Sequence, residues 1–88
     1  MNVIVNGHKL TEQDFKDGFV KKYSDFELVS LSVNSAEKLV VFTAKAKENY
    51  IHTIGSTVFI DFERKEIQGT LKLVDFECYI NAVLQETI

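Results

Sequence analysis

The sequence predicts an α+β fold: an N-terminal β-hairpin, a helix, a four-stranded antiparallel meander and a C-terminal helix. Three patterns lead to this prediction. They are an Asn-Gly pair between short apolar runs, apolar residues at helical spacing over 12–23 and 76–87, and apolar–polar alternation between these two segments. Because the four strands follow one another without an intervening helix, α+β is favoured over βαβ alternation. We expect the order ββαββββα, with both helices on one sheet face.

The N-terminal hairpin is predicted from segments 3–5 and 8–10, which flank Asn6 and Gly7. Asn-Gly is the preferred pair for a type I′ turn because both residues tolerate positive φ. A two-stranded hairpin is marginally stable in water, so this one must pack against the rest of the chain.

The first helix is expected over 12–23. Thr11 is a natural N-cap, and Asp14 three residues later can complete a capping box in place of the usual Glu. Phe15 and Phe19 are four residues apart and begin an apolar helix face.

Four strands are expected over 26–33, 40–47, 57–63 and 67–73, because apolar and polar residues alternate there. Alternation assigns one set to the core: Val29, Leu31, Val40, Phe42, Val58, Ile60, Leu71 and Leu73. It assigns a second set to the outer face: Leu28, Val41, Thr43, Phe59 and Thr70, ringed by Lys45, Lys47, Asp61, Glu63, Gln68 and Lys72.

The segment 74–88 has two readings, a continued strand or a helix. As a strand, it would place Asp75 and Glu77 on the face of the apolar residues before them. As a helix, it has an apolar stripe that includes Phe76, Tyr79 and Ile80, with Asp75 as the N-cap. We therefore expect a helix over 76–87.

Length and composition predict one cytoplasmic domain, 1–88. The chain has one Cys, so it cannot form an intramolecular disulfide, which fits a reducing compartment. No apolar run approaches the ~20 residues of a membrane helix. Ten basic residues against thirteen acidic ones, a net charge of −3, provide no basic footprint for nucleic acid.

No catalytic, cofactor or metal motif is present. Cys78 is the only thiol, and neither His8 nor His52 is near it in sequence, so a packing role for the thiol is favoured over a nucleophile. The imidazoles lack the spacing of a zinc site.

Two carboxylate pairs also have ordinary structural explanations. Asp61 and Glu63 suit a solvated strand face, and Asp75 and Glu77 suit a helix start. The Gly55-Ser56-Thr57 segment lacks the lysine and spacing of a P-loop. The sequence therefore predicts a protein that is not an enzyme and has no cofactor or small-molecule substrate.

Two surfaces are candidates for partner binding. The loop 48–56 is unusually apolar, and it either packs over the core or presents anchors to a partner through Tyr50, Ile51, His52 and Ile54. The outer sheet face offers an apolar centre with a polar rim, and its candidate contact residues are Val41, Thr43, Phe59, Lys45 and Lys47.

These features lead to a hypothesis of a non-enzymatic protein–protein interaction module, including self-association. An inhibitor or accessory protein of a phage or bacterial mobile element is one version. The alternative is single-strand nucleic-acid binding on the sheet, where Phe59 would stack on bases beside Lys45, Lys47 and Lys72. Asp61, Glu63 and the net charge oppose this alternative.

Overall fold

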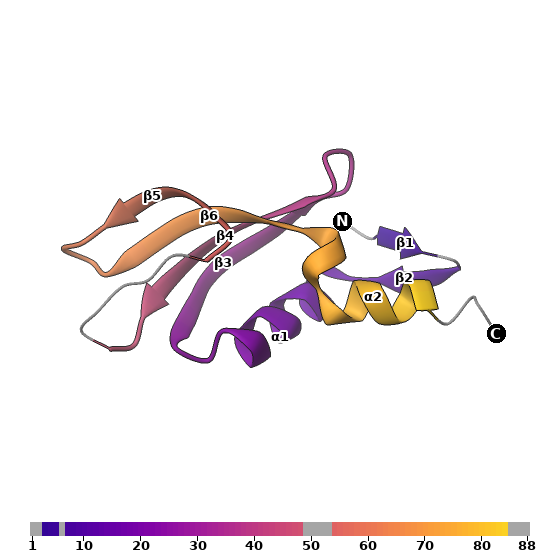
Figure 1. The fold of residues 1–88 in the computed structure, drawn as a ribbon, viewed down its shortest axis with the longest axis horizontal. Coiled ribbons are helices and arrows are strands. Elements are labelled where there is room, and N and C mark those ends of the chain that lie inside the picture. Colours follow the sequence, from indigo (N-terminus) through magenta and orange to yellow (C-terminus); the bar gives the residue numbers. More distant parts are fainter. Residues whose placement is uncertain (1–2, 6, 49–53, 85–88) are drawn as a thin grey trace.

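A computed structural model describes residues 3–5, 7–48 and 54–84 of the chain (Figure 1). Within these residues, two helices and two antiparallel sheets occur in the order ββαββββα, which confirms the predicted α+β fold. The elements are β1 (Val3–Val5), β2 (His8–Leu10), α1 (Glu12–Lys22), β3 (Phe26–Asn34), β4 (Leu39–Ala46), β5 (Ser56–Asp61), β6 (Glu66–Lys72), a 3₁₀ turn η1 (Leu73–Asp75) and α2 (Glu77–Leu84).

The four-stranded sheet has the order β3-β4-β6-β5, which corrects the expected meander. Lys45 near the end of β4 pairs with Glu66, whereas Ser56 at the start of β5 pairs with Thr70. The connection from β4 to β5 therefore starts near one end of β6 and finishes near the other. Tight turns force consecutive strands to pair, but this longer connection lets β5 pass to the far side of β6.

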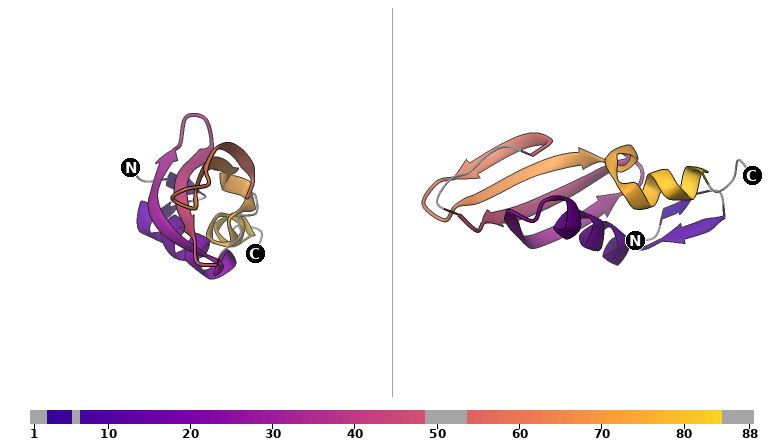
Figure 2. Two further views of the ribbon diagram at one scale, coloured as in Figure 1. Left: turned by 90° about the vertical axis from the view of Figure 1, so that its left-hand side faces the viewer. Right: turned by 60° about the horizontal axis from the view of Figure 1, so that its bottom comes forward.

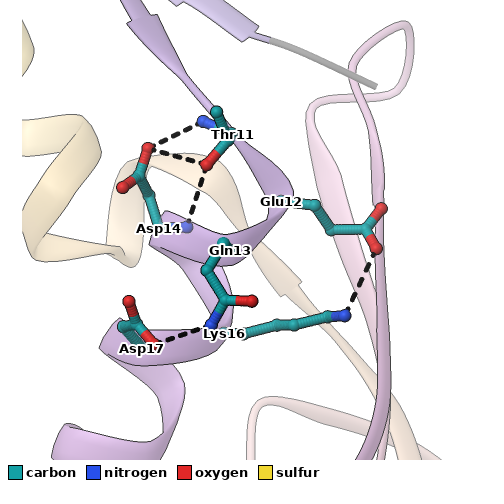
Figure 3. Close-up of polar contacts among 6 residues, drawn as sticks. All are labelled: Thr11, Glu12, Gln13, Asp14, Lys16 and Asp17. Atoms are coloured by element: carbon teal, nitrogen blue, oxygen red, sulfur yellow. Dashed lines mark hydrogen bonds and ion pairs between the residues drawn. The ribbon is translucent and has the colours of Figure 1, made fainter.

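Helix α1 begins with the capping box that the sequence predicts (Figure 3). The Thr11 amide donates to Asp14 Oδ2 at 2.7 Å, and the Asp14 amide donates to Thr11 Oγ1 at 3.3 Å. The Asp14 amide also donates to the Thr11 carbonyl at 3.0 Å. Together these bonds satisfy two of the backbone donors at the helix start. The helix ends at Lys22, one residue short of the expected boundary.

Aromatic contacts join α1 to both halves of the fold. Phe15 and Phe19 are fully buried. The Phe19 ring lies 5.1 Å from that of Phe42 on β4, and the Phe15 ring lies 5.1 Å from that of Phe76 in an edge-on arrangement. One helix face thus ties the sheet to the C-terminal segment.

The two helices do not share the sheet face, contrary to expectation. Helix α1 packs on β3, whereas α2 contacts α1 and the β1–β2 hairpin and lies beyond the end of the sheet (Figures 1 and 2). The hairpin needs a cover because two strands alone are marginal, and α2 supplies part of it. The helical prediction for the C-terminal segment is correct: α2 spans Glu77–Leu84, and residues 85–87 of the predicted helix lie outside the described residues. Helix α2 begins one residue later than expected, and Asp75 ends η1 rather than capping α2.

This arrangement makes the molecule elongated, with principal extents of 47 × 23 × 18 Å. Its radius of gyration is 13.7 Å, against roughly 12 Å expected for a globular chain of this length. In the described part of the chain, neither helix is long and apolar enough to cross a membrane.

Two β-bulges change which side chains reach the core. The β3–β4 register shifts between Leu28 and Ser30, and the β5–β6 register shifts between Thr57 and Phe59. An extra residue in a strand displaces the inward–outward alternation by one position. Val29 and Val58 were expected in the core, but they are 54% and 76% exposed. Leu28 was expected on the outer face and instead packs against the core.

Candidate functional site

The outer sheet face is built from rows of side chains that the strand register places opposite one another. Val41 pairs with Ser32 on one side and with Thr70 on the other. In the next row, Thr43 pairs with Gln68, which pairs in turn with Phe59. Hydroxyl and amide groups therefore separate Val41 from Phe59, and the predicted apolar centre is a mixed surface.

The third row of this face is charged. Lys45 pairs with Glu27 on β3 and with Glu66 on β6, and Glu66 pairs with Asp61 on β5. One ammonium thus lies among three carboxylates, so the row carries net negative charge. Lys47 is exposed just beyond the end of β4, and its amide donates to the Asp25 carbonyl at 3.0 Å.

The largest exposed apolar side chains of the sheet gather along one edge. Val58 is 76% exposed and Phe59 is 54% exposed on β5, and Phe62 directly after β5 is 76% exposed. Among the described strands, β5 pairs only with β6, so no described strand covers its other backbone edge. We call Val58, Phe59 and Phe62 the β5 edge patch. Edge strands seldom expose so much apolar surface without a function.

In the described part of the central loop, the Ile54 side chain packs inward. Ile54 is only 3% exposed and belongs to the core, so its side chain is not available to a partner. Gly55 follows with φ of +57°, and a Cβ there would lie 2.5 Å from the Thr70 carbonyl oxygen. Glycine is required at this close approach. Tyr50, Ile51 and His52 lie outside the described residues.

Asp61 has a structural role in the turn after β5. Its Oδ1 accepts hydrogen bonds from the Glu63 and Arg64 amides, each at 3.0 Å, and Arg64 Nε lies 4.0 Å from its Oδ2. These bonds are those of an Asx turn. Glu63 is exposed to solvent, so the pair does not form the enclosed site that acid–base chemistry needs.

One cleft of about 310 Å³ is lined by His8, Asp14 and Cys78, which are distant in sequence. Burial raises the pKa of the Cys78 thiol, and the negative charges of Asp14 and Glu77 raise it further. The Asp14 carboxylate already binds the Thr11 amide. The thiolate that nucleophilic chemistry requires is therefore disfavoured here. Among the residues that the structure describes, no three His, Cys, Asp or Glu side chains form a group that could hold a metal ion.

Sequence reasoning found Phe59 and the β4 side chains of the outer face, but it missed two members of the β5 edge patch. Val58 was assigned to the core because the alternation of apolar and polar residues does not reveal the bulge. Phe62 is four residues after Val58, so the same alternation puts it on the same side of the strand. The run from Val58 to Phe62, with Asp61 as its one charged residue, was the available signal.

The chain was compared with protein-family models, with curated proteins and with solved structures, and no match was found.

Proposed function

We propose that this protein is a small, non-enzymatic module that binds another protein through the β5 edge patch and the outer sheet face beside it. The observation that carries the proposal is the exposure of Val58, Phe59 and Phe62, between 54% and 76%, on a sheet edge that no described strand covers. Aromatic side chains of this kind anchor protein interfaces, because each buries a large area at a low entropic cost.

The chemistry around the patch fits a partner that is made and folded separately. Gln68 lies opposite Phe59 in the strand register, Thr43 follows in the same row, and Thr70 lies in the neighbouring row. Interfaces between separately stable proteins combine a few apolar anchors with hydrogen-bonding groups and a polar rim, whereas permanent interfaces are more apolar. The mixed outer face therefore supports reversible binding of a different protein.

The bulge at Val58 bears on how a partner binds. A bulge twists an edge strand and interrupts regular backbone pairing, so it opposes the addition of a full partner strand. It also leaves Val58 highly exposed. The proposed contact is therefore made mainly by side chains that enter apolar pockets of the partner.

Nucleic-acid binding is less well supported on this face. A single-strand platform needs a positively charged groove beside its aromatic groups. Lys45 instead stands opposite the acidic residues Glu27 and Glu66 in the strand register, in a row with more carboxylates than ammonium groups. We also propose that the protein acts in the cytoplasm, because its single Cys fits a reducing compartment. Inhibition of the partner protein is one version of this proposal.

The test compares two valines that occupy bulges on opposite sheet edges. Immobilised wild-type protein, Val58→Lys and Val29→Lys are each incubated with lysate of the cells in which the protein is made. The proposal expects a protein retained by the wild type and by Val29→Lys, and lost with Val58→Lys. Equal retention by all three chains, with circular dichroism confirming that they are folded, would contradict it.

A further inference from the structure

A cavity of about 530 Å³ lies between the N-terminal hairpin and the end of the four-stranded sheet that carries the β3–β4 turn (Figure 1). Four elements that are distant in sequence contribute to it. Its lining includes Val3 and Val5 of β1, Ser35 and Lys38 of the β3–β4 turn, Leu73 of η1 and Tyr79 of α2. Sites for small ligands have volumes of roughly 300–1,000 Å³ and combine apolar walls with a few polar groups, so both the size and the composition of this cavity fit a ligand.

The inner wall of the cavity is apolar and held in place by the core. Val3 is 8% exposed and Leu73 is 2% exposed, and both belong to the hydrophobic core. Val5 and Tyr79 are partly buried and pack against that core. A ligand does not have to order a wall that is already packed, so less of its binding free energy is lost. An apolar group placed against this wall would be removed from water.

The charge at the cavity is positive. Lys38 is the only charged residue among the described lining residues, and the hydroxyl groups of Ser35 and Tyr79 are also part of the lining. In the described part of the chain, no carboxylate forms an ion pair with the Lys38 ammonium. One ammonium balances one negative charge, whereas a phosphate monoester carries nearly two at neutral pH. A carboxylate therefore fits this site better, and its oxygens can accept from an ammonium or a hydroxyl.

The β3–β4 turn fixes the position of Lys38. Its backbone is in the left-handed region, with φ of +57°, and its carbonyl accepts a hydrogen bond from the Leu73 amide at 3.2 Å. Lys65 has nearly the same backbone conformation, with φ of +59°, in the turn between β5 and β6. Lys65 does not line the cavity. The chain thus contains two lysines in equivalent turns, and only Lys38 lies at the cavity.

We propose that this cavity binds a small carboxylic acid with an apolar body. The carboxylate lies beside the Lys38 ammonium, and the apolar body lies against Val3, Val5 and Leu73. The ligand is bound and not converted, so the inference goes beyond the proposed function without making the protein an enzyme. It is also independent of that function, because no member of the β5 edge patch lines the cavity. The sequence did not predict the site, because its residues come from four separate segments.

The test is a titration of the full, ¹⁵N-labelled chain with octanoate, followed by the NMR signals of the backbone amides. The amides of Lys38, Leu73 and β1 are expected to shift, with a dissociation constant of about 1 mM or tighter. Octylammonium has the same apolar chain and the opposite charge. It is expected to bind the wild type at least about 5-fold more weakly, because its charge would face that of Lys38.

The matched variants are Lys38→Asn and Lys65→Asn. Asn tolerates the left-handed conformation of both positions, so each substitution removes a charge without straining the turn. Lys38→Asn is expected to raise the dissociation constant for octanoate about 5-fold, the upper range for an exposed ion pair. Lys65→Asn is expected to bind octanoate as the wild type does, and Val58→Lys likewise. The amide spectrum of each variant verifies that it is folded.

Three results would overturn the inference. One is the absence of amide shifts at the cavity in the wild type up to about 20 mM octanoate. Another is equal binding of octanoate and octylammonium by the wild type, which needs no variant to fold. The third is equal weakening of octanoate binding by Lys38→Asn and Lys65→Asn, or by neither. Loss of partner capture with Val58→Lys would leave these results unaffected.

Discussion

Val29 and Val58 are counterparts on the two edge strands of the sheet: each is the extra residue of a β-bulge, and each is largely exposed. Bulges twist edge strands and make uncontrolled strand pairing less favourable. The two edges differ in their surroundings, because α1 packs against β3, whereas the exposed Phe59 and Phe62 accompany Val58. A bulge therefore opposes strand pairing at both sheet edges, and of these two described edges only that of β5 is enriched in exposed aromatic groups.

The close approach of β5 to β6 depends on Gly69. A Cβ at this position would lie 2.7 Å from the Ser56 carbonyl oxygen and 3.2 Å from the Phe42 ring. Gly69→Ala is therefore expected to lower the free energy of unfolding by about 1–3 kcal/mol, the usual effect of overpacking. Urea denaturation measures this change.

Gly18→Ala is the matched comparison and should have the opposite sign. Gly18 lies inside α1, and an added Cβ would meet Phe76 at 3.6 Å, an ordinary contact. Replacing glycine by alanine in a helix interior stabilises by about 0.5–1 kcal/mol. Destabilisation by this substitution would show that the space between α1 and Phe76 does not accept a methyl group.

The capping box of α1 predicts a moderate effect of Thr11→Ala. The substitution removes the hydroxyl that accepts from the Asp14 amide, and it is expected to cost about 1 kcal/mol of unfolding free energy. Gln13→Ala breaks only an exposed contact with Asp17 and should change stability by less than about 0.5 kcal/mol. Thermal denaturation followed by circular dichroism compares the two. Equal effects would argue against the cap.

The aromatic core predicts a large effect at Phe19. Its ring is fully buried between Phe42 and Tyr23, and Phe19→Ala is expected to cost about 3–5 kcal/mol, enough to unfold much of a small domain. The neighbouring Val20 is 48% exposed, and Val20→Ala should change stability by no more than about 0.5 kcal/mol. Urea titration of the two variants, with the intrinsic fluorescence of tyrosine, tests this ordering.

The Cys78 thiol should react slowly in the native protein. Burial first, and then the charges of Asp14 and Glu77, raise its pKa, so less thiolate is present at a given pH. The shift favours the fold while pH stays below the pKa of the unfolded thiol, and this contribution is lost as pH rises through the folded value. Iodoacetamide at pH 8 should label the native chain more slowly than the urea-unfolded chain. Faster native labelling would indicate an activated thiol.

Local features were predictable from the sequence because their causes are local. Thr11 and Asp14 identified the start of α1 through spacing alone, and the apolar stripe around Phe76 and Tyr79 identified α2 as a helix. The alternation along β4, with Val40 inside and Val41 outside, was also correct. Each of these depends on residues within a few positions of one another.

Features set by distant contacts were not predictable. The bulges at Val29 and Val58 depend on how neighbouring strands pair, and no local residue marks them. The strand order depends on how β4 is connected to β5, and the alternation of apolar and polar residues within each strand contains no information about that connection. For the candidate site, the sequence identified Phe59 but not Val58, because the bulge reverses the side that alternation assigns to it.

The most direct test of partner binding is site-specific photo-cross-linking from the β5 edge patch. Benzoylphenylalanine replaces Phe59 in one chain and Val20, which is exposed at 48% on α1, in another. Both chains are expressed in the source cells and irradiated. We predict a cross-linked partner protein from position 59 and none from position 20. Cross-linking from position 20 with none from position 59 would contradict it.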